Sequence, residues 1–221
     1  MKSKNFAKTT VVFILSIFLS SILFYFDLGL GIATIFILTV LVFIASYLDS
    51  DKEFLLSLGF QKKKATLKNL LIYAPITAFI ILMIYRFLLV PIVTKFTGVP
   101  IDISAFDPIR GNLSILLSTL VLVWTSAAFG EEIIFRGYFM TRFSKVFGNS
   151  SFSVVANVIL FAIFFGAIHA YQGLTGQILS GLTGAIIAIL FHLKRNDLWF
   201  CIVVHGMIDT FAFIAVYLNI F

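Results

Sequence analysis

Long apolar runs separated by short polar segments make up most of this chain. A helix needs about 20 apolar residues to cross a bilayer core about 30 Å thick, and seven runs come close to that length. Because no long linker divides them, we predict one all-α fold, a polytopic transmembrane helical bundle of about seven helices. The runs that define these helices are residues 9–26, 28–48, 70–93, 113–140, 153–170, 178–193 and 198–221.

The composition supports a membrane protein. Of the 221 residues, 61% are apolar and 12% are charged, against roughly a quarter charged in an ordinary soluble domain. So few charges cannot cover so much apolar surface in water, so a soluble fold is excluded. The first run lacks a small-x-small cleavage pattern, and we expect it to be a retained helix. The single cysteine, Cys201, leaves no basis for a disulfide framework.

The distribution of basic residues predicts the orientation. The net charge of +6 does not indicate a nucleic-acid partner, because in a membrane protein the side on which each Lys or Arg lies carries the information. If seven helices alternate, most basic residues fall on one side, which the positive-inside rule places in the cytoplasm with the N-terminus. We therefore expect an integral protein of the cell membrane, surrounded by lipid bilayer, with its C-terminus outside. The residues on the predicted cytoplasmic side are Lys2, Lys4, Lys8, Lys52, Lys62, Lys63, Lys64, Lys68, Arg142, Lys145, Lys194 and Arg195, against Lys95 and Arg110 opposite.

Ionisable side chains inside the later runs are the candidate functional residues. Each costs at least ~2.5 kcal/mol on insertion scales, so a buried one is a functional candidate by default. Arg86 and His192 lie near the ends of their runs, where snorkelling or an interfacial position accounts for them. The remaining candidates are Glu131, Glu132 and Arg136 in the fourth run, His169 in the fifth, and His205 with Asp209 in the seventh.

The spacing of these residues suggests different roles. Glu132 and Arg136 are four apart with the acid first, the favoured order for an ion pair along one helix face. Glu131 points about 100° away from Glu132, so it is free to face a cavity and serve as a general base. His205 and Asp209 are also four apart and share a face. The alternatives are a charge cluster that only marks a helix end, and a polar seam that only holds helices together.

Counting residues from the predicted helix ends tests whether these groups can meet. If the fourth helix leaves the membrane near residue 140 and the fifth enters near residue 158, one cluster open toward the cytoplasm is geometrically possible. A start near residue 150 would instead put His169 some 10 Å too deep. With the preferred boundaries, the depths at 1.5 Å per residue are about 14 Å for Glu131, 17 Å for His169, 10 Å for His205 and 17 Å for Asp209.

The donor types indicate hydrolysis. Two imidazoles with carboxylates form a plausible zinc site, and they also suit metal-free activation of water. The sequence contains no H-E-x-x-H, Walker A or G-x-S-x-G motif. Both the metal-dependent and the metal-free versions stay open at this point.

The order of these motifs resembles that of a known family. The patterns E-E-x-x-x-R, F-x-x-x-H (Phe165 and His169) and H-x-x-x-[N/D], each on a separate late helix, are similar to those of the CPBP family. This family comprises CAAX proteases and bacteriocin-processing enzymes, and is also called Abi or type II CAAX prenyl endopeptidase. The resemblance covers about residues 113–213, which suggests N-terminal helices with a cytoplasmic loop over 1–112 and a catalytic core over 113–221, integrated into one domain.

The resemblance implies an intramembrane endopeptidase. It makes Glu131 the base that activates water, supported by the Glu132 and Arg136 pair, with His169 and His205 as its partners or metal ligands. Asp209 would take an oxyanion or ligand position, where the family more often has Asn. If a divalent metal such as zinc is bound, its ligands would be His169, His205 and Asp209, together with Glu131.

The expected substrate is a membrane-associated peptide or a prenylated-protein-like chain that enters from the cytoplasmic leaflet. Eukaryotic relatives remove the last three residues of prenylated CAAX proteins, while many bacterial ones are linked to bacteriocin immunity or peptide processing. One alternative is a non-enzymatic immunity or scaffold protein that uses the polar seam for binding. Another is a small proton-coupled transporter, although no repeated half or pair of broken helices supports it.

Overall fold

The computed structural model describes residues 10–11, 14–15 and 32–220. Throughout these residues every regular element is helical, as predicted, and the fold is an all-α polytopic helical bundle. Apart from positions 10–11 and 14–15, the predicted helix 9–26 lies outside the described residues.

Several helices run on through wide π-type turns. Asn69–Thr97 and Leu113–Phe147 are each helical from end to end, and each contains such turns. The elements in chain order are α2 (Ile32–Ser50), η1 (Asp51–Glu53), α3 (Phe54–Ser57), η2 (Lys62–Lys64), η3 (Asn69–Tyr73), α4 (Ala74–Ile84), η4 (Tyr85–Leu89), α5 (Val90–Thr97), η5 (Ser104–Ile109), α6 (Leu113–Leu122), η6 (Val123–Glu131), η7 (Ile133–Met140), α7 (Thr141–Phe147), α8 (Ser151–Ala167), η8 (Ala170–Gln172), α9 (Gly173–Leu193) and α10 (Leu198–Tyr217).

Five helices of the described chain are long and apolar enough to cross a membrane. A further apolar helix, Ser151–Ala167, is shorter, and seven crossings remain a prediction. The five candidate spans are Ala33–Ser50, Asn69–Thr97, Leu113–Phe147, Ala170–Leu193 and Leu198–Tyr217.

Polar residues misled the prediction of one helix boundary. The predicted start of the sixth helix at 178 is wrong, because α9 begins at Gly173; there Thr175 is buried and donates to the Val99 carbonyl over 2.7 Å. The fifth helix begins at Ser151, close to the predicted 153, and its entry into hydrocarbon near residue 158 stays a prediction. The side chain of Ser150 caps α8 by accepting from the Ser153 amide, and Asn157 donates to the Met140 carbonyl over 3.0 Å.

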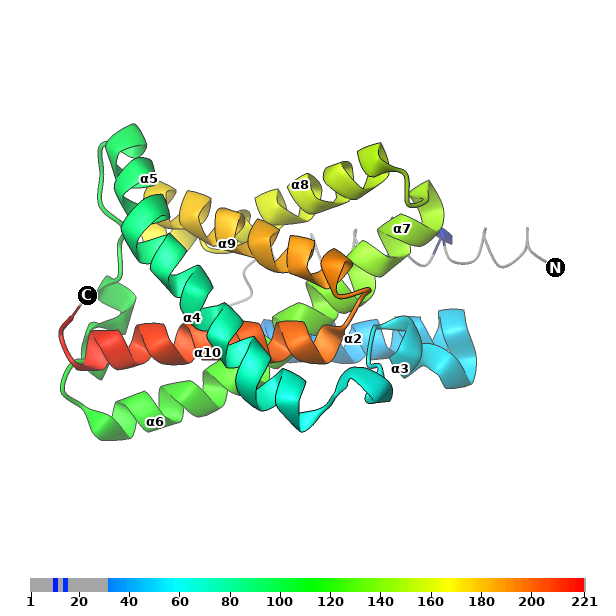
Figure 1. Ribbon diagram of the computed structural model, residues 1–221, viewed down its shortest axis with the longest axis horizontal. Coiled ribbons are helices and arrows are strands. Elements are labelled where there is room, and N and C mark those ends of the chain that lie inside the picture. Colours follow the sequence, from blue (N-terminus) through cyan, green and yellow to red (C-terminus); the bar gives the residue numbers. More distant parts are fainter. Residues whose placement is uncertain (1–9, 12–13, 16–31, 221) are drawn as a thin grey trace.

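Helix α10 lies in the middle of the bundle (Figure 1). It packs against α4, which crosses it diagonally, and against η6 and α9. Helices α8 and α9 form a close pair, because a Cβ atom on Gly166 would lie 2.5 Å from the Gln177 carbonyl oxygen. Small residues allow such close approach of helix backbones in membranes. This packing brings helices from the second half of the chain together around α10.

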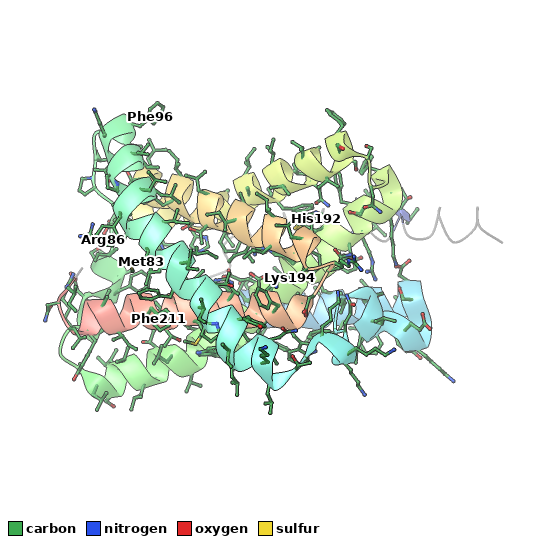
Figure 2. The ribbon with its side chains drawn as sticks, viewed as in Figure 1. Met83, Arg86, Phe96, His192, Lys194 and Phe211 are labelled. Carbon is green, nitrogen blue, oxygen red and sulfur yellow. The ribbon has the colours of Figure 1, made fainter. Side chains whose placement is uncertain are left out.

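The basic residues gather at one end of the molecule. Figure 1 shows α3, the α7–α8 turn and the α9–α10 turn toward one end, and α5, segment 98–112 and the C-terminus at the other. In Figure 2, His192 and Lys194 lie toward the first end, and Phe96 and the exposed Arg86 lie toward the second. We call the first the basic end; it carries Lys52, Lys62, Lys63, Lys64, Lys68, Arg142, Lys145, Lys194 and Arg195.

A buried ion pair ties the N-terminal helices to the later half. Arg142 Nε lies 3.1 Å from Asp49 Oδ2, and both side chains are at most 3% exposed. The same guanidinium donates to Ser46 Oγ over 2.7 Å and to the Ser57 carbonyl over 3.2 Å. Helices α2 and α3 are therefore fixed to α7 at the basic end.

Candidate active site

Glu132 lies at the centre of the ionisable cluster. It stands between the π-type turns η6 and η7 and is fully buried. Its Oε1 accepts a hydrogen bond from Arg136 Nη1 over 2.8 Å, which confirms the ion pair predicted from their spacing. The same oxygen lies 2.9 Å from His205 Nδ1. Because a carboxylate only accepts, we assign the proton of that contact to His205 Nδ1, so two helices meet at one oxygen.

Arg136 reaches a third helix. Its Nη2 donates to the carbonyl of Gly184 on α9 over 2.7 Å, and its guanidinium lies 4.9 Å from the centre of the Phe165 ring. A Cβ atom on Gly184 would come within 2.9 Å of that ring. Glycine at 184 therefore lets α9, Phe165 and the arginine pack together. Arg136 therefore holds the cluster together, because it pairs with Glu132, donates to Gly184 and contacts the Phe165 ring.

His205 and Asp209 line one face of α10, as their spacing predicts. His205 Nε2 lies 3.5 Å from Asp209 Oδ2, and the Asp209 side chain is 26% exposed. The imidazole thus stands between two carboxylates from different helices. The sequence prediction paired His205 with Glu131, whereas in the structure its hydrogen bond is to Glu132.

Glu131 carries a carboxylate oxygen that is free to act. The residue is 8% exposed, and among the described residues its Oε2 is buried without a hydrogen-bond partner. It lies within electrostatic range of His205 and Asp209. A buried acceptor without a hydrogen bond lowers the stability of the fold, so its presence indicates a functional role.

His169 lies in the turn that follows α8 and not on the predicted helix, because α8 ends at Ala167. Its Nδ1 is 2.7 Å from the Phe165 carbonyl oxygen, and its ring centre is 4.8 Å from that of Phe165. The Phe165 ring is in turn 5.9 Å from the ring of His205. Both histidines therefore contact the same aromatic ring, with His169 Nε2 left for another partner.

The predicted metal ligands do not assemble as a coordination set. Within the described part of the chain, no three His, Cys, Asp or Glu side chains are grouped closely enough to hold an ion. His205 uses Nδ1 for Glu132, and His169 uses Nδ1 for the Phe165 carbonyl. Residues in these positions do not fit the tetrahedral donor set that zinc requires, so we route no chemical step through a metal.

Sequence reasoning missed residues that adjoin the site. Trp124 packs against Gly206, where a Cβ atom would lie 2.8 Å from the indole, and its Nε1 donates to Thr210 Oγ1 over 3.1 Å. Tyr171 stacks near His169 with ring centres 5.9 Å apart. Gly206, directly after His205, could have indicated close packing of another helix at this position, because small residues let helices approach closely in membranes. Tyr171 had no comparable signal in the sequence.

Residues 113–211 match a protein-family model described as Rce1-like: Type II CAAX prenyl endopeptidase Rce1-like. This part of the chain is similar to that family. The Rce1-like segment includes the whole cluster around Glu132, and it supports the resemblance to CAAX proteases. A family of this kind implies a protease acting on a peptide or protein at a membrane. Searches of curated proteins and of solved structures each gave no match.

Proposed function

We propose that this chain is an intramembrane endopeptidase that hydrolyses a peptide bond with a water molecule activated by Glu131. The observation that carries the proposal is the buried Glu131 oxygen without a partner, within electrostatic range of the His205 and Asp209 pair. Glu132 and Arg136 are positioning residues, because Glu132 Oε1 is held by both Arg136 and His205 and so fixes the imidazole. Glu132 Oε2 is also buried without a partner, but in the described part of the chain Glu131 forms no ion pair with either of its oxygens.

The proposed reaction balances with these groups alone. Glu131 takes a proton from water as the water oxygen bonds to the scissile carbonyl carbon, giving a tetrahedral oxyanion. Because the Nδ1–H of His205 is held by Glu132, His205 stabilises that charge in its doubly protonated form, by donating its Nε2–H to the oxyanion. Glu131 then gives the proton to the leaving nitrogen, and the C–N bond breaks to release a carboxylic acid and an amine.

The proposed substrate is a membrane-associated peptide or a prenylated protein terminus that reaches the site from the cytoplasmic leaflet. The family description, prenyl endopeptidase, supports this class. The site lies within helices that are apolar over most of their length, which suits a substrate held at the membrane by a lipid group.

A Glu131→Gln variant tests the proposal. The amide keeps the shape and removes the base, so the kcat for release of the C-terminal fragment from a farnesylated CAAX peptide should fall by at least ~100-fold. The Kd for the same peptide should stay unchanged. Asp107→Asn, an exposed carboxylate at the opposite end of the molecule, is the matched control and should keep full turnover.

Equal loss of binding and turnover, or no loss of either, would contradict the role of Glu131. Binding without turnover in the unmodified protein would favour the scaffold alternative. The same assay after chelation tests the zinc hypothesis: activity should survive metal depletion. Loss of activity that added zinc restores, together with loss of bound zinc in His205→Ala, would show that the histidines bind an ion despite their separation.

A further inference from the structure

An open groove of about 620 Å³ lies along the outside of the bundle. Ligand sites commonly occupy about 300–1,000 Å³. Its walls come from α2, η3, η6 and α10, and they are almost entirely apolar. The lining residues are Phe36, Thr39, Val40, Phe43, Leu70, Trp124, Thr125, Phe129, Trp199, Ile202 and Val203.

The few polar groups of the groove are already satisfied. Thr39 Oγ1 donates to the Ile35 carbonyl over 2.7 Å, and Thr125 Oγ1 donates to the Val121 carbonyl over 2.8 Å. The indole N–H of Trp124 is bonded to Thr210. The groove therefore offers contact surface to an apolar chain and little to a polar ligand.

The groove is separate from the candidate active site. Successive residues of a helix turn by about 100°, so Val203 faces roughly 160° away from His205 on α10. The Trp124 ring lines the groove and packs against Gly206, so it lies between the groove and the candidate active site. An occupant of the groove would touch neither Glu131 nor Glu132.

One end of the groove meets the basic end of the molecule. The ring centre of Phe60 is 4.9 Å from that of Trp199 and 6.1 Å from that of Phe129, both of which line the groove. Lys62 follows Phe60 by two residues, and Lys68 precedes the lining residue Leu70 by two. Because two residues span at most about 7 Å, these lysine backbones lie close to the groove.

The lysines in this segment have different surroundings. Lys64 Nζ donates to the carbonyls of Lys194 and Arg195 over 2.8 and 2.9 Å, which fixes the segment to the end of α9. Lys62 and Lys63 are exposed, and in the described part of the chain neither forms a salt bridge. An apolar groove that ends at exposed cations matches a molecule with a hydrocarbon chain and an anionic head.

We propose that this groove binds an acyl chain of an anionic phospholipid, whose phosphate group lies against Lys62, Lys63 and Lys68. This lipid site goes beyond the proposed peptidase function and does not depend on it. The lipid would fill the space between α2 and α10 at the basic end, where anionic headgroups are attracted to Lys and Arg.

Tryptophan fluorescence provides a direct test, because both tryptophans of the chain, Trp124 and Trp199, line the groove. The full chain would be placed in phosphatidylcholine bilayers that contain acyl-brominated phosphatidylglycerol or acyl-brominated phosphatidylcholine, since bromine quenches indole on contact. Half-quenching should need about tenfold less of the anionic lipid than of the neutral one.

Two pairs of variants separate a site from general lipid contact. Lys62→Gln with Lys63→Gln should remove most of the preference for the anionic lipid, whereas Lys95→Gln at the other end should keep it. Val40→Phe should fill the groove and reduce quenching by both lipids. Val155→Phe is the matched control, because both valines are 56% exposed and Val155 on α8 does not line the groove.

Equal quenching by the two lipids in the unmodified protein would contradict the proposal, as would an unchanged preference in the double lysine variant. An effect of Val155→Phe as large as that of Val40→Phe would also contradict it. Absence of quenching by either lipid would mean that protein covers the groove, either the N-terminal run 9–26 or a second copy of the chain. None of these results would bear on peptide hydrolysis.

Discussion

Two adjacent glutamates have different environments, and the difference should separate stability from chemistry. Glu132 binds both Arg136 and His205 through Oε1, whereas Glu131 forms no ion pair in the described part of the chain; the Oε2 atom of each glutamate is buried without a hydrogen-bond partner. Glu132→Gln leaves Arg136 as a buried charge without its ion partner, at a cost of about 3–5 kcal/mol in the free energy of unfolding. Thermal unfolding in detergent should therefore occur at a clearly lower temperature.

A second substitution supplies the control for this prediction. In Glu132→Gln with Arg136→Gln no unpaired charge remains, so part of the lost stability should return. Glu131→Gln should unfold at nearly the same temperature as the unmodified protein, because this substitution removes no ion pair. If Glu131→Gln and Glu132→Gln destabilise equally, the assignment of a structural role to Glu132 is wrong.

At the residue scale, spacing along one helix was enough to predict contacts within that helix. It was not enough to predict contacts between helices. The four-residue spacing of Glu132 and Arg136 was enough to predict their ion pair. The partner of His205 could not be predicted, because the choice between two neighbouring glutamates depends on how α10 is rotated against helix 113–147. That rotation is set by Trp124 lying on Gly206, a contact between distant parts of the sequence.

The same contact gives a prediction at the scale of the helix pair. In Gly206→Ala the new Cβ atom would lie 2.8 Å from the indole of Trp124, so the helices must separate or the ring must move. Overpacking of this kind costs about 1–3 kcal/mol. Gly206→Ala should lower the unfolding temperature and also reduce kcat, because His205 is the preceding residue.

A smaller side chain at the other position should rescue the variant. Trp124→Leu alone removes packing and costs stability, but Gly206→Ala should then add little further loss. A double-mutant cycle on thermal unfolding measures that coupling. Additive effects of the two substitutions would show that this close contact does not hold the helices in register.

At the element scale, one helix end was predicted wrongly and the next helix start closely. The fourth helix continues to Phe147 and not to 140, while the fifth begins at Ser151, close to the predicted 153. Counted from these observed ends at 1.5 Å per residue, Glu131 lies about 24 Å along its helix, and His169, in the turn just after α8, is at a similar level of about 27 Å. The points at which these helices enter a membrane stay a prediction.

The whole molecule has one basic end, which gives a prediction about orientation. In a Cys201→Ala background, single cysteines at Lys63 and Asp107 should be labelled from opposite sides of the membrane, with position 63 accessible from the cytoplasm. Lys63 precedes Lys64, which donates to the carbonyl of Lys194 at the end of α9. Asp107 accepts from Arg110, which contacts Asn219 near the C-terminus. The end of α9 and the C-terminus lie toward opposite ends of the bundle. Labelling of position 63 by an impermeant reagent added to intact cells would reverse the predicted orientation.

The buried contact of Asp49 also bears on how the protein is made. Lys145, which together with Arg142 contacts the Asp49 carboxylate, follows it by 96 residues. At a synthesis rate of roughly 5–20 residues per second, the aspartate exists for about 5–20 s before the ribosome has made these cations. The ion pair that fixes α2 to helix 113–147 can therefore form only after Arg142 has been made.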